Sequence, residues 1–327
     1  MEKEKPVNIW EVAKKAGVSK STVSRVLNGY GASEKTQKKV WKAIEELKYR
    51  PNISARSLRN KTNNLLGILI PTDLPYDTIA DPVNPSKLKG VISKIKELNY
   101  DVLMFIEDTS DFQRFHEIIM EKGLAGLLLF NEISPEVLQN FRKYNIPYVS
   151  VNWQDSTYEE HCYVKTDLAQ ATILGVEHLL SRGYTDIGLM NWESPIIEKT
   201  FIQIMKEKGL PWEGKVWNTE LYMSEKELWE YLDAHPHQAY FSFSYFASLR
   251  IIKYCALKGL RIPEDRALIS YEFFPFYNFV HPRLTGIQQQ LELMGQIAVE
   301  KLVAMIKGED HVESQLISPK IVIRETT

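Results

Sequence analysis

A group of polar side chains between residues 20 and 28 has the spacing to line one face of a helix. At about 100° per residue these side chains fall within an arc of about 140°, and Val23, Val26 and Leu27 fall on the opposite side. Ammonium, hydroxyl, guanidinium and amide groups on such a face can hydrogen-bond base edges and phosphates in a major groove. An ordinary amphipathic helix with a solvated polar face has the same pattern, so both interpretations stand at this point. The polar group consists of Lys20, Ser21, Ser24, Arg25 and Asn28.

Three short helices must position this face. Apolar residues recur with the helical period from residue 9 to residue 16, Asn8 precedes them as an N-cap, and Gly17 follows as a turn. Ser19 can cap the second helix, and a third helix is expected after Ser33. This order predicts an N-terminal all-α domain with a helix-turn-helix.

Charge is distributed unevenly along the 327 residues, although the formal net charge is only −2. Residues 1–64 contain 15 Lys and Arg against 6 Asp and Glu, a net of +9. Residues 65–327 contain 25 against 36, a net of −11. A basic segment attached to an acidic body favours nucleic acid as the partner of that segment, and a solvated charged face is the alternative.

Two longer stretches of the sequence bear on this domain: one contains the polar helix, and the other follows the three helices. Residues 7–28 read VNIWEVAKKAGVSKSTVSRVLN, and residues 49–58 read YRPNISARSL. In this order and at this separation they resemble the helix-turn-helix and the hinge of the LacI/GalR family of bacterial transcription regulators. The resemblance implies a helix-turn-helix DNA-binding domain over residues 1–48, a hinge helix over residues 49–63, and an effector-binding and dimerisation domain over residues 64–327.

The resemblance also implies roles for individual side chains. Lys20, Ser21 and Arg25 occupy the positions that read the major groove, and Trp10 stands where the family often places a side chain against the DNA backbone. Leu58 matches the leucine that wedges into the central base step, and such wedges unstack and kink the duplex. Phosphate-contacting or supporting positions are Ser19, Thr22, Ser24, Asn28, Ser33 and Thr36, and the hinge contacts are Asn52 and Ala55.

From residue 64 onward, eight short apolar runs of the strand type alternate with eight longer amphipathic stretches. This alternation predicts parallel sheets wrapped by helices, and the length suits two α/β lobes better than one open sheet. The resemblance continues through residues 177–188, 258–265, 282–289 and 319–324, and it implies a periplasmic-binding-protein-like body of two parallel-sheet lobes. We expect one lobe to combine residues 64–160 with 288–306, and the other to combine residues 161–287 with 307–327.

The ligand of such a body is expected between the lobes, at the carboxyl ends of the strands. Some positions that the family uses for sugars differ here, because Ile197 replaces an arginine and Ser244-Tyr245 replaces Asn-Asp. Three interpretations stay open: a less common carbohydrate or derivative, a different metabolite, or a site filled by its own aromatic side chains. The expected effector-binding residues are Asn152, Trp153, Trp192, Tyr222, Tyr245, Glu272 and Gln289.

Composition excludes several other classes of protein. Hydrophobic residues make up 44% and charged residues 25%, which is typical of a globular protein and not of collagen or a disulfide scaffold. No apolar run approaches the ~18 residues that span a bilayer, and the two cysteines fit no metal or redox motif. The sequence has no nucleophile elbow, phosphate loop or zincin motif. We therefore expect no enzyme activity, no catalytic residue, no metal, no cofactor and no membrane contact, and a cytoplasmic location.

Together, the residues and the resemblance predict a sequence-specific DNA-binding transcription regulator, a repressor of carbohydrate-related genes controlled by a small-molecule effector. We expect a homodimer on double-stranded DNA with a near-palindromic operator, because the two-fold symmetry of a dimer matches that of such a site. One alternative is a regulator with a degenerate or non-sugar pocket, acting as an activator or with a corepressor. Another is a cytoplasmic small-molecule-binding module, for which the basic first segment and the hinge motif would have no use.

Overall fold

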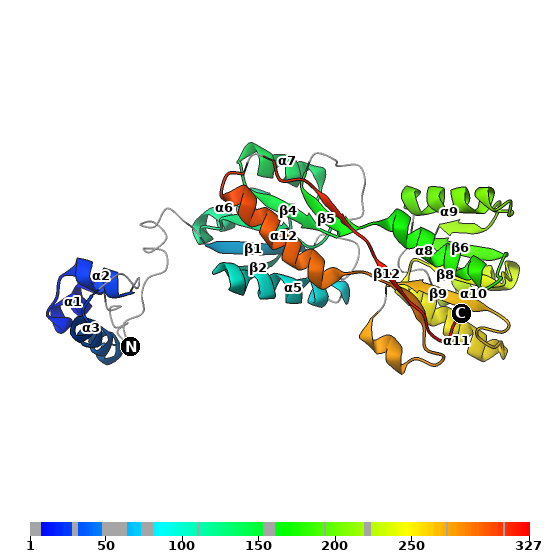
Figure 1. Cartoon of the computed structure of the whole chain (residues 1–327). Helices are drawn as coiled ribbons and strands as arrows, with labels where there is room; N and C mark the ends of the chain where they lie inside the picture. Colours follow the sequence, from blue (N-terminus) through cyan, green and yellow to red (C-terminus); the bar gives the residue numbers. More distant parts are fainter. Residues whose placement is uncertain are drawn as a thin grey trace. The chain divides into compact units, whose positions relative to one another are not determined.

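The computed structural model describes ten stretches of the chain, residues 8–27, 32–47, 64–72, 81–109, 112–152, 161–192, 194–218, 224–272, 274–309 and 311–327. The chain divides into two compact units, Met1–Asn63 and Asn64–Thr327 (Figure 1), and each is considered by itself. The hinge helix expected over residues 49–63 lies outside the described residues.

The first unit has the three helices that the sequence predicts, α1 (Ile9–Ala16), α2 (Lys20–Leu27) and α3 (Glu34–Glu46). Asn8 caps α1 by accepting hydrogen bonds from the backbone amides of Trp10 and Glu11. Gly17 then takes a left-handed conformation (φ 66°), which a residue with a side chain rarely adopts and which turns the chain into α2. The buried apolar core that holds the three helices together consists of Val12, Ala13, Ala16, Val23, Val26, Val40 and Ala43.

The second unit contains two six-stranded sheets. The first sheet has the strand order β11-β5-β4-β3-β1-β2, and every pairing in it is parallel. Its strands are β1 (Leu65–Pro71), β2 (Asp101–Glu107), β3 (Gly126–Leu129), β4 (Tyr148–Val151), β5 (Tyr163–Thr166) and β11 (Gln315–Ile317). The helices packed with this sheet are α5 (Val83–Leu98), α6 (Phe112–Lys122), α7 (Pro135–Lys143) and α12 (Leu291–Ile306).

The second sheet has the order β12-β10-β9-β8-β6-β7, and only the β10–β12 pairing is antiparallel. Its strands are β6 (Ile187–Asn191), β7 (Val216–Asn218), β8 (Ala239–Ser242), β9 (Ala267–Tyr271), β10 (Thr285–Gln288) and β12 (Lys320–Val322). The accompanying helices are α8 (Leu168–Ser181), α9 (Pro195–Glu207), α10 (Glu225–Ala234), α11 (Tyr245–Lys258) and the short 3-10 helix η1 (Pro275–Phe279).

Alternation along the central strands explains why both faces of each sheet are covered. Leu128 of β3 belongs to the core that includes α5 and α12, whereas Leu127 and Leu129 belong to the core that includes α6 and α7. In the second sheet, Tyr240 and Phe241 of β8 divide in the same way between two cores. Because successive side chains of a strand point to opposite faces, these nearly continuous apolar runs require a layer of helices on each side.

Three chain crossings join the two sheets, and they lie side by side. They run from β5 to α8, from β10 to α12, and from β11 to β12 (Figure 1). The backbone amide of Asp167 donates to the carbonyl oxygen of Ile317 at 3.0 Å, and the side chain of Gln290 donates to the carbonyl of Ser318 at 2.7 Å. The crossings are therefore tied to one another by hydrogen bonds.

The positions of the crossings correct the expected lobe boundaries. β5 and β11 both pair within the first sheet, whereas residues 161–287 and 307–327 were expected in the second lobe. Each of these strands is only three or four residues long. Partner choice for such short segments depends on backbone pairing across the sheet, which leaves little trace in the local sequence.

Two glycines allow α5 and α12 to pack in direct backbone contact. A Cβ atom at Gly90 would lie 1.9 Å from the carbonyl oxygen of Glu292, and one at Gly295 would lie 2.3 Å from the carbonyl oxygen of Lys87. Side chains at these positions would push the helices apart. The close approach sets the position of α5, which carries a charged side chain of the site described below.

Candidate functional site

The second helix of the first unit is held by hydroxyl caps. Ser19 accepts a hydrogen bond from the backbone amide of Thr22 at 3.1 Å, and its hydroxyl lies 2.7 Å from that of Ser21 and 2.9 Å from that of Thr22. Ser33 caps α3 in the same way, accepting from the backbone amide of Thr36. These bonds explain why a short helix of modest propensity starts where it does.

The exposed face of α2 carries the side chains suited to reading DNA. Ser21 and Arg25 are exposed and Lys20 is half-buried, whereas Val23 and Val26 face the core. The Lys20 ammonium lies 4.8 Å from the centre of the Trp10 ring, and that ring is 64% exposed. A cation over an aromatic face is attracted by the ring quadrupole. Trp10 therefore restricts the position of the Lys20 side chain at the edge of the polar face.

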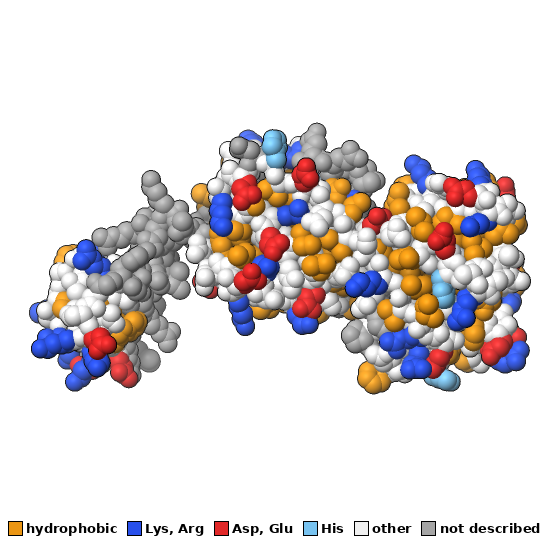
Figure 2. All heavy atoms as spheres, viewed as in Figure 1, with side chains coloured by type: hydrophobic (Ala, Val, Ile, Leu, Met, Phe, Trp, Pro, Cys, Tyr) orange, Lys and Arg blue, Asp and Glu red, His pale blue; other side chains and the backbone are white. Residues whose placement is uncertain are grey.

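Two positively charged side chains of α2 remain available to bind an anionic partner. Among the residues that the structure describes, neither Lys20 nor Arg25 forms an ion pair. Glu46 at the end of α3 pairs instead with Lys15 at 3.0 Å, and the Lys15 hydrogen bond lowers the pKa of that carboxyl. Figure 2 shows Lys and Arg side chains at several places on this unit, with a few Asp and Glu side chains between them.

The structure brings most of the predicted DNA-contacting side chains onto the first two helices and the start of the third. They are Trp10, Ser19, Lys20, Ser21, Thr22, Ser24 and Arg25, with Ser33 and Thr36 at α3. Asn28, Asn52, Ala55 and Leu58 lie outside the described residues. The assignment of these positions to DNA stays a prediction.

A second polar cluster lies where strands of the two sheets end in the body. Asn152 follows β4 and Glu272 follows β9, and both have positive φ angles, 62° and 74°. Such angles are uncommon for residues with side chains, and backbone of this kind tends to occur at functional positions. The strand ends are where parallel α/β sheets usually bind ligands.

Gln289 lies at one of the chain crossings, beside Asn152. The Thr166 hydroxyl of β5 donates to the side-chain oxygen of Gln289 and also lies 3.4 Å from that of Asn152. Thr166 and Gln289 are both buried. Two of the predicted effector-binding residues are therefore joined through a third residue that the sequence did not single out.

Two buried ionisable side chains, one acidic and one basic, belong to different elements of this region. Lys87 of α5 is 2% exposed, and Glu272 is 7% exposed. Burial lowers the pKa of Lys87 to about 8, against the attraction of Asp81 and Glu272. Burial also raises the pKa of Glu272 to about 8, assisted by the negative charge of Asp81 and opposed by Lys87. Each group thus lies within the electrostatic field of the other.

The positions at which this sequence differs from the family's sugar-binding residues lie in or directly before helices beside the second sheet, and their contacts are with neighbouring parts of the chain. Ile197 is buried in the apolar core beneath α8 and α9, and Ser244 caps α11 by accepting from the amide of Ala247 at 3.2 Å. Tyr245 packs edge-on against Phe274, with ring centres 5.3 Å apart. Trp192, at the end of β6, is 39% exposed, and Trp153 and Tyr222 lie outside the described residues.

Lys87, like Thr166, is a site residue that the sequence analysis missed. The spacing along the helix could have revealed it. Lys87 lies four residues from Val83 and from Val91, and these valines, with Ile95 one turn further on, are buried apolar residues. A lysine on the apolar face of an amphipathic helix is unusual, because a buried ammonium is costly unless it has a polar role.

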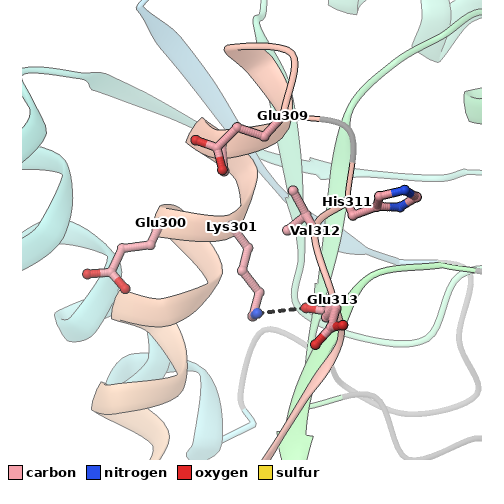
Figure 3. A pocket seen from close by; sticks show the side chains of 7 residues that line it. Glu300, Lys301, Glu309, His311, Val312 and Glu313 are labelled. Carbon is pink, nitrogen blue, oxygen red and sulfur yellow. Dashed lines mark hydrogen bonds between the residues drawn. The ribbon is translucent and has the colours of Figure 1, made fainter.

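Two hollows of about 400 and 430 Å³ lie at other places in the body. The first lies beside the end of α12, where Lys301 reaches across to donate to the backbone carbonyl of Glu313 at 2.6 Å (Figure 3). The second lies beside α9 and is lined by Pro195, Glu198, Lys199, Ile202 and Asn218. Neither hollow contains the Lys87 or Glu272 side chain.

No group of three potential metal ligands occurs among the residues described. His237 instead forms a hydrogen bond with Asp186, Nδ1 to Oδ1 at 3.0 Å, and Lys215 pairs with the same oxygen at 2.8 Å. Within the described stretches, no helix combines the length and apolar character needed to cross a membrane.

Comparison with known proteins agrees with this architecture. Residues 8–52 match the lacI family of bacterial regulatory proteins, and residues 176–327 match the periplasmic binding protein-like domain. The HTH-type transcriptional regulator DegA of Bacillus subtilis (strain 168) is 26% identical over 336 residues, which cover 98% of this chain and 97% of DegA. The HTH-type transcriptional repressor PurR of Aliivibrio salmonicida (strain LFI1238) is 28% identical over 340 residues, covering 97% and 98% of the two chains.

A similar solved structure is that of the Lac repressor dimer bound to operator and the anti-inducer ONPF. It superposes with a TM-score of 0.84 at 23% identity and covers 98% of this chain and 99% of that one. The fold and the two matched domains define a regulator with a helix-turn-helix head and a periplasmic-binding-protein-like body. The chain thus carries a LacI-family helix-turn-helix domain and a periplasmic-binding-protein-like domain, and its relatives of similar length are transcription regulators.

Proposed function

We propose that the protein is a transcriptional repressor that binds a near-palindromic operator as a homodimer and responds to a small molecule bound in its body. The observation that carries the proposal is the exposed polar face of α2, with Arg25 and Lys20 unpaired among the described residues and the opposite face buried. A helix of this kind fits the major groove, where an arginine can bond guanine in bidentate fashion. The relatives named as repressors support the direction of control.

The homodimer is supported by exposed apolar side chains on the first half of the body. β2 is the edge strand of its sheet, and its Met104 and Ile106 are exposed, together with Ile92 of the neighbouring helix α5. An edge strand with an apolar outer surface invites pairing with another chain. We infer that a second copy covers this surface in the operator-bound form, in keeping with the dimer in the similar Lac repressor structure.

The control of DNA binding is inferred to be allosteric. The three adjacent crossings between the sheets give the body a natural place to bend, and Asn152 and Gln289 lie beside them. A ligand changes operator affinity only if it binds the two arrangements of the body unequally. Carbohydrate-related genes are the proposed targets, and the bacterial cytoplasm, where chromosomal DNA lies, is the proposed location. We further infer that the protein acts without catalysis, since its relatives are named as regulators.

In vitro selection of duplex DNA with the full-length protein tests the proposal, and the expected result is an enriched near-palindromic sequence. Operator affinity is then compared for wild type, Arg25→Ala and Arg25→Lys. Loss of a bidentate arginine contact costs about 1–3 kcal/mol and relaxes the base preference at one position. Arg25→Lys keeps the charge but loses the planar fork, so it should retain much non-specific affinity and still lose the base preference.

Failure to enrich any sequence, with or without metabolite extract, would refute the proposal. An unchanged base preference in both Arg25 variants would remove that residue from recognition while leaving the rest of α2 in place. The same assay gives the sign of the ligand response, since an inducer lowers operator affinity and a corepressor raises it.

A further inference from the structure

The Glu272 carboxyl is deeply buried but has no polar partner among the described residues. Within those stretches its carboxyl makes no hydrogen bond and no ion pair, and Lys87 acts on it only as a nearby charge. The residue follows β9 in a left-handed conformation (φ 74°) that directs the chain at the strand end. A buried carboxyl without partners is costly, and a cost of this kind at a strand end points to a ligand that satisfies it.

The Lys87 ammonium is held in one position and has bonding capacity to spare. Its Nζ donates to the carbonyl oxygen of Phe130 at 2.5 Å and lies 4.7 Å from the centre of the Phe130 ring. An ammonium has three donors, and of the described residues only Phe130 accepts from it. The remaining donors are therefore available at the end of β3.

Two amides extend this donor-rich region. Asn84, one turn before Lys87 on α5, donates from Nδ2 to the side-chain oxygen of Asn131 at 3.3 Å, and both residues are buried. Asp81 accepts from the backbone amide of Val83 at 3.0 Å at the start of α5, and its negative charge acts on both Lys87 and Glu272. The polar groups next to Lys87 are thus suited to oxygen-rich ligands.

We propose, as an extension of the proposed regulator function, that the effector is an acidic carbohydrate derivative, whose anionic group binds Lys87 and whose hydroxyls bind Glu272. A carboxylate or a phosphate would complete the coordination of the fixed ammonium by charge-assisted hydrogen bonds. A hydroxyl group can donate to Glu272 in either protonation state, and it can also accept from the carboxyl when that group is protonated. A sugar acid and a sugar phosphate share this chemistry.

The alternative ligand classes fit less well. A protonated amine would have to enter next to the buried Lys87 charge, and like charges at close range repel strongly where water is excluded. A neutral sugar would leave the buried ammonium with dipoles only. The acidic group is therefore the feature expected to decide affinity.

Calorimetric titration of the full-length protein tests the proposal with matched ligands. The first set is D-gluconate, D-glucose 6-phosphate, D-glucose and D-glucosamine, the second is D-galacturonate with D-galactose, and inorganic phosphate is the control for a simple anion. At least one acid should bind tenfold or more tightly than its neutral parent and its amine. D-gluconate and D-glucose 6-phosphate distinguish a carboxylate ligand from a phosphate ligand.

Two variants of α5 locate the binding of the acidic group. Lys87→Met keeps the length of the side chain and removes the charge, and it should weaken the acid at least thirtyfold while changing the neutral sugar less than threefold. Lys96→Met is the matched control, because Lys96 is exposed on the same helix, and it should bind the acid as wild type does. Thermal unfolding of both variants checks that they are folded.

Glu272→Gln gives a second measurement that does not depend on the Lys87 variant. Measured at pH 6, below the raised pKa of this carboxyl, it should weaken an acid and its neutral parent by the same factor, since a neutral amide then replaces a neutral carboxyl and only the hydroxyl contacts change. Equal binding of acid, sugar and amine would overturn the proposal, as would acid binding that survives Lys87→Met, or no binding by any acid of the panel. Operator selection on the same samples separates these failures from failure of the regulator function.

Discussion

Replacing Glu272 with glutamine should change how the stability of the body depends on pH. The pKa of this carboxyl rises from an ordinary 4.5 to about 8 in the folded protein, because the side chain is buried. The folded state therefore holds a proton that the unfolded state releases between these values. The stabilisation that comes from this carboxyl is fully present below pH 4.5, and it is lost as the pH rises through 8.

The magnitude follows from the size of this difference. At roughly 1.4 kcal/mol per pH unit, the interval from 4.5 to about 8 corresponds to about 5 kcal/mol. Solvent relaxation around a buried charge reduces such values, so we expect a loss of about 2–4 kcal/mol between pH 5 and pH 8. Lys87 has a lowered pKa of about 8 and works in the opposite direction above that pH. The combined contribution of Glu272 and Lys87 to the free energy of unfolding is therefore smallest near pH 8.

Urea unfolding followed by circular dichroism at pH 5, 6, 7 and 8 measures the effect. Glu272→Gln cannot ionise, so its stability relative to wild type should rise steadily with pH, by about 2–4 kcal/mol between pH 5 and pH 8. Glu264→Gln, at an exposed position of the same half of the body, is the matched control and should show no such trend. A difference between Glu272→Gln and wild type that stays constant from pH 5 to pH 8 would refute the reasoning.

Three further substitutions test separate contacts. Gly90→Ala should destabilise the body by about 1–3 kcal/mol in urea, because the added methyl meets the backbone of α12 and the two helices must move apart; unchanged stability would mean that α5 and α12 are not in backbone contact. Met104→Glu should shift the protein from dimer to monomer in sedimentation experiments, since it places a charge on the apolar edge strand, and a persistent dimer would locate the interface elsewhere. Trp10→Leu should weaken operator binding about two- to fivefold through loss of the ring beneath Lys20, and affinity equal to wild type would contradict that contact. The matched controls, which place the same changes at other exposed positions, are Trp41→Leu and Met120→Glu.

Local features of the chain were sufficient to predict the first unit. The cap at Asn8, the turn at Gly17 and the start of a helix after Ser33 depend on interactions within a few residues, and each appears as predicted. The long apolar runs that form β1, β6 and β9 were also predictable, because a strand buried on both faces needs an unbroken series of apolar side chains. Short strands such as β7 and β10 lacked that signal.

The ligand site of the body shows what only the tertiary structure decides. Asn152, Glu272 and Gln289 were named from the resemblance to the family's ligand positions, and the structure places them at strand ends and a chain crossing. Lys87 gains its importance from burial, which arises because Gly90 lets α12 press against α5 and exclude water from its apolar face. The pattern along the chain determines which segments become helices and strands. Which charges lose contact with water depends on how those elements pack, and that is a property of the whole fold.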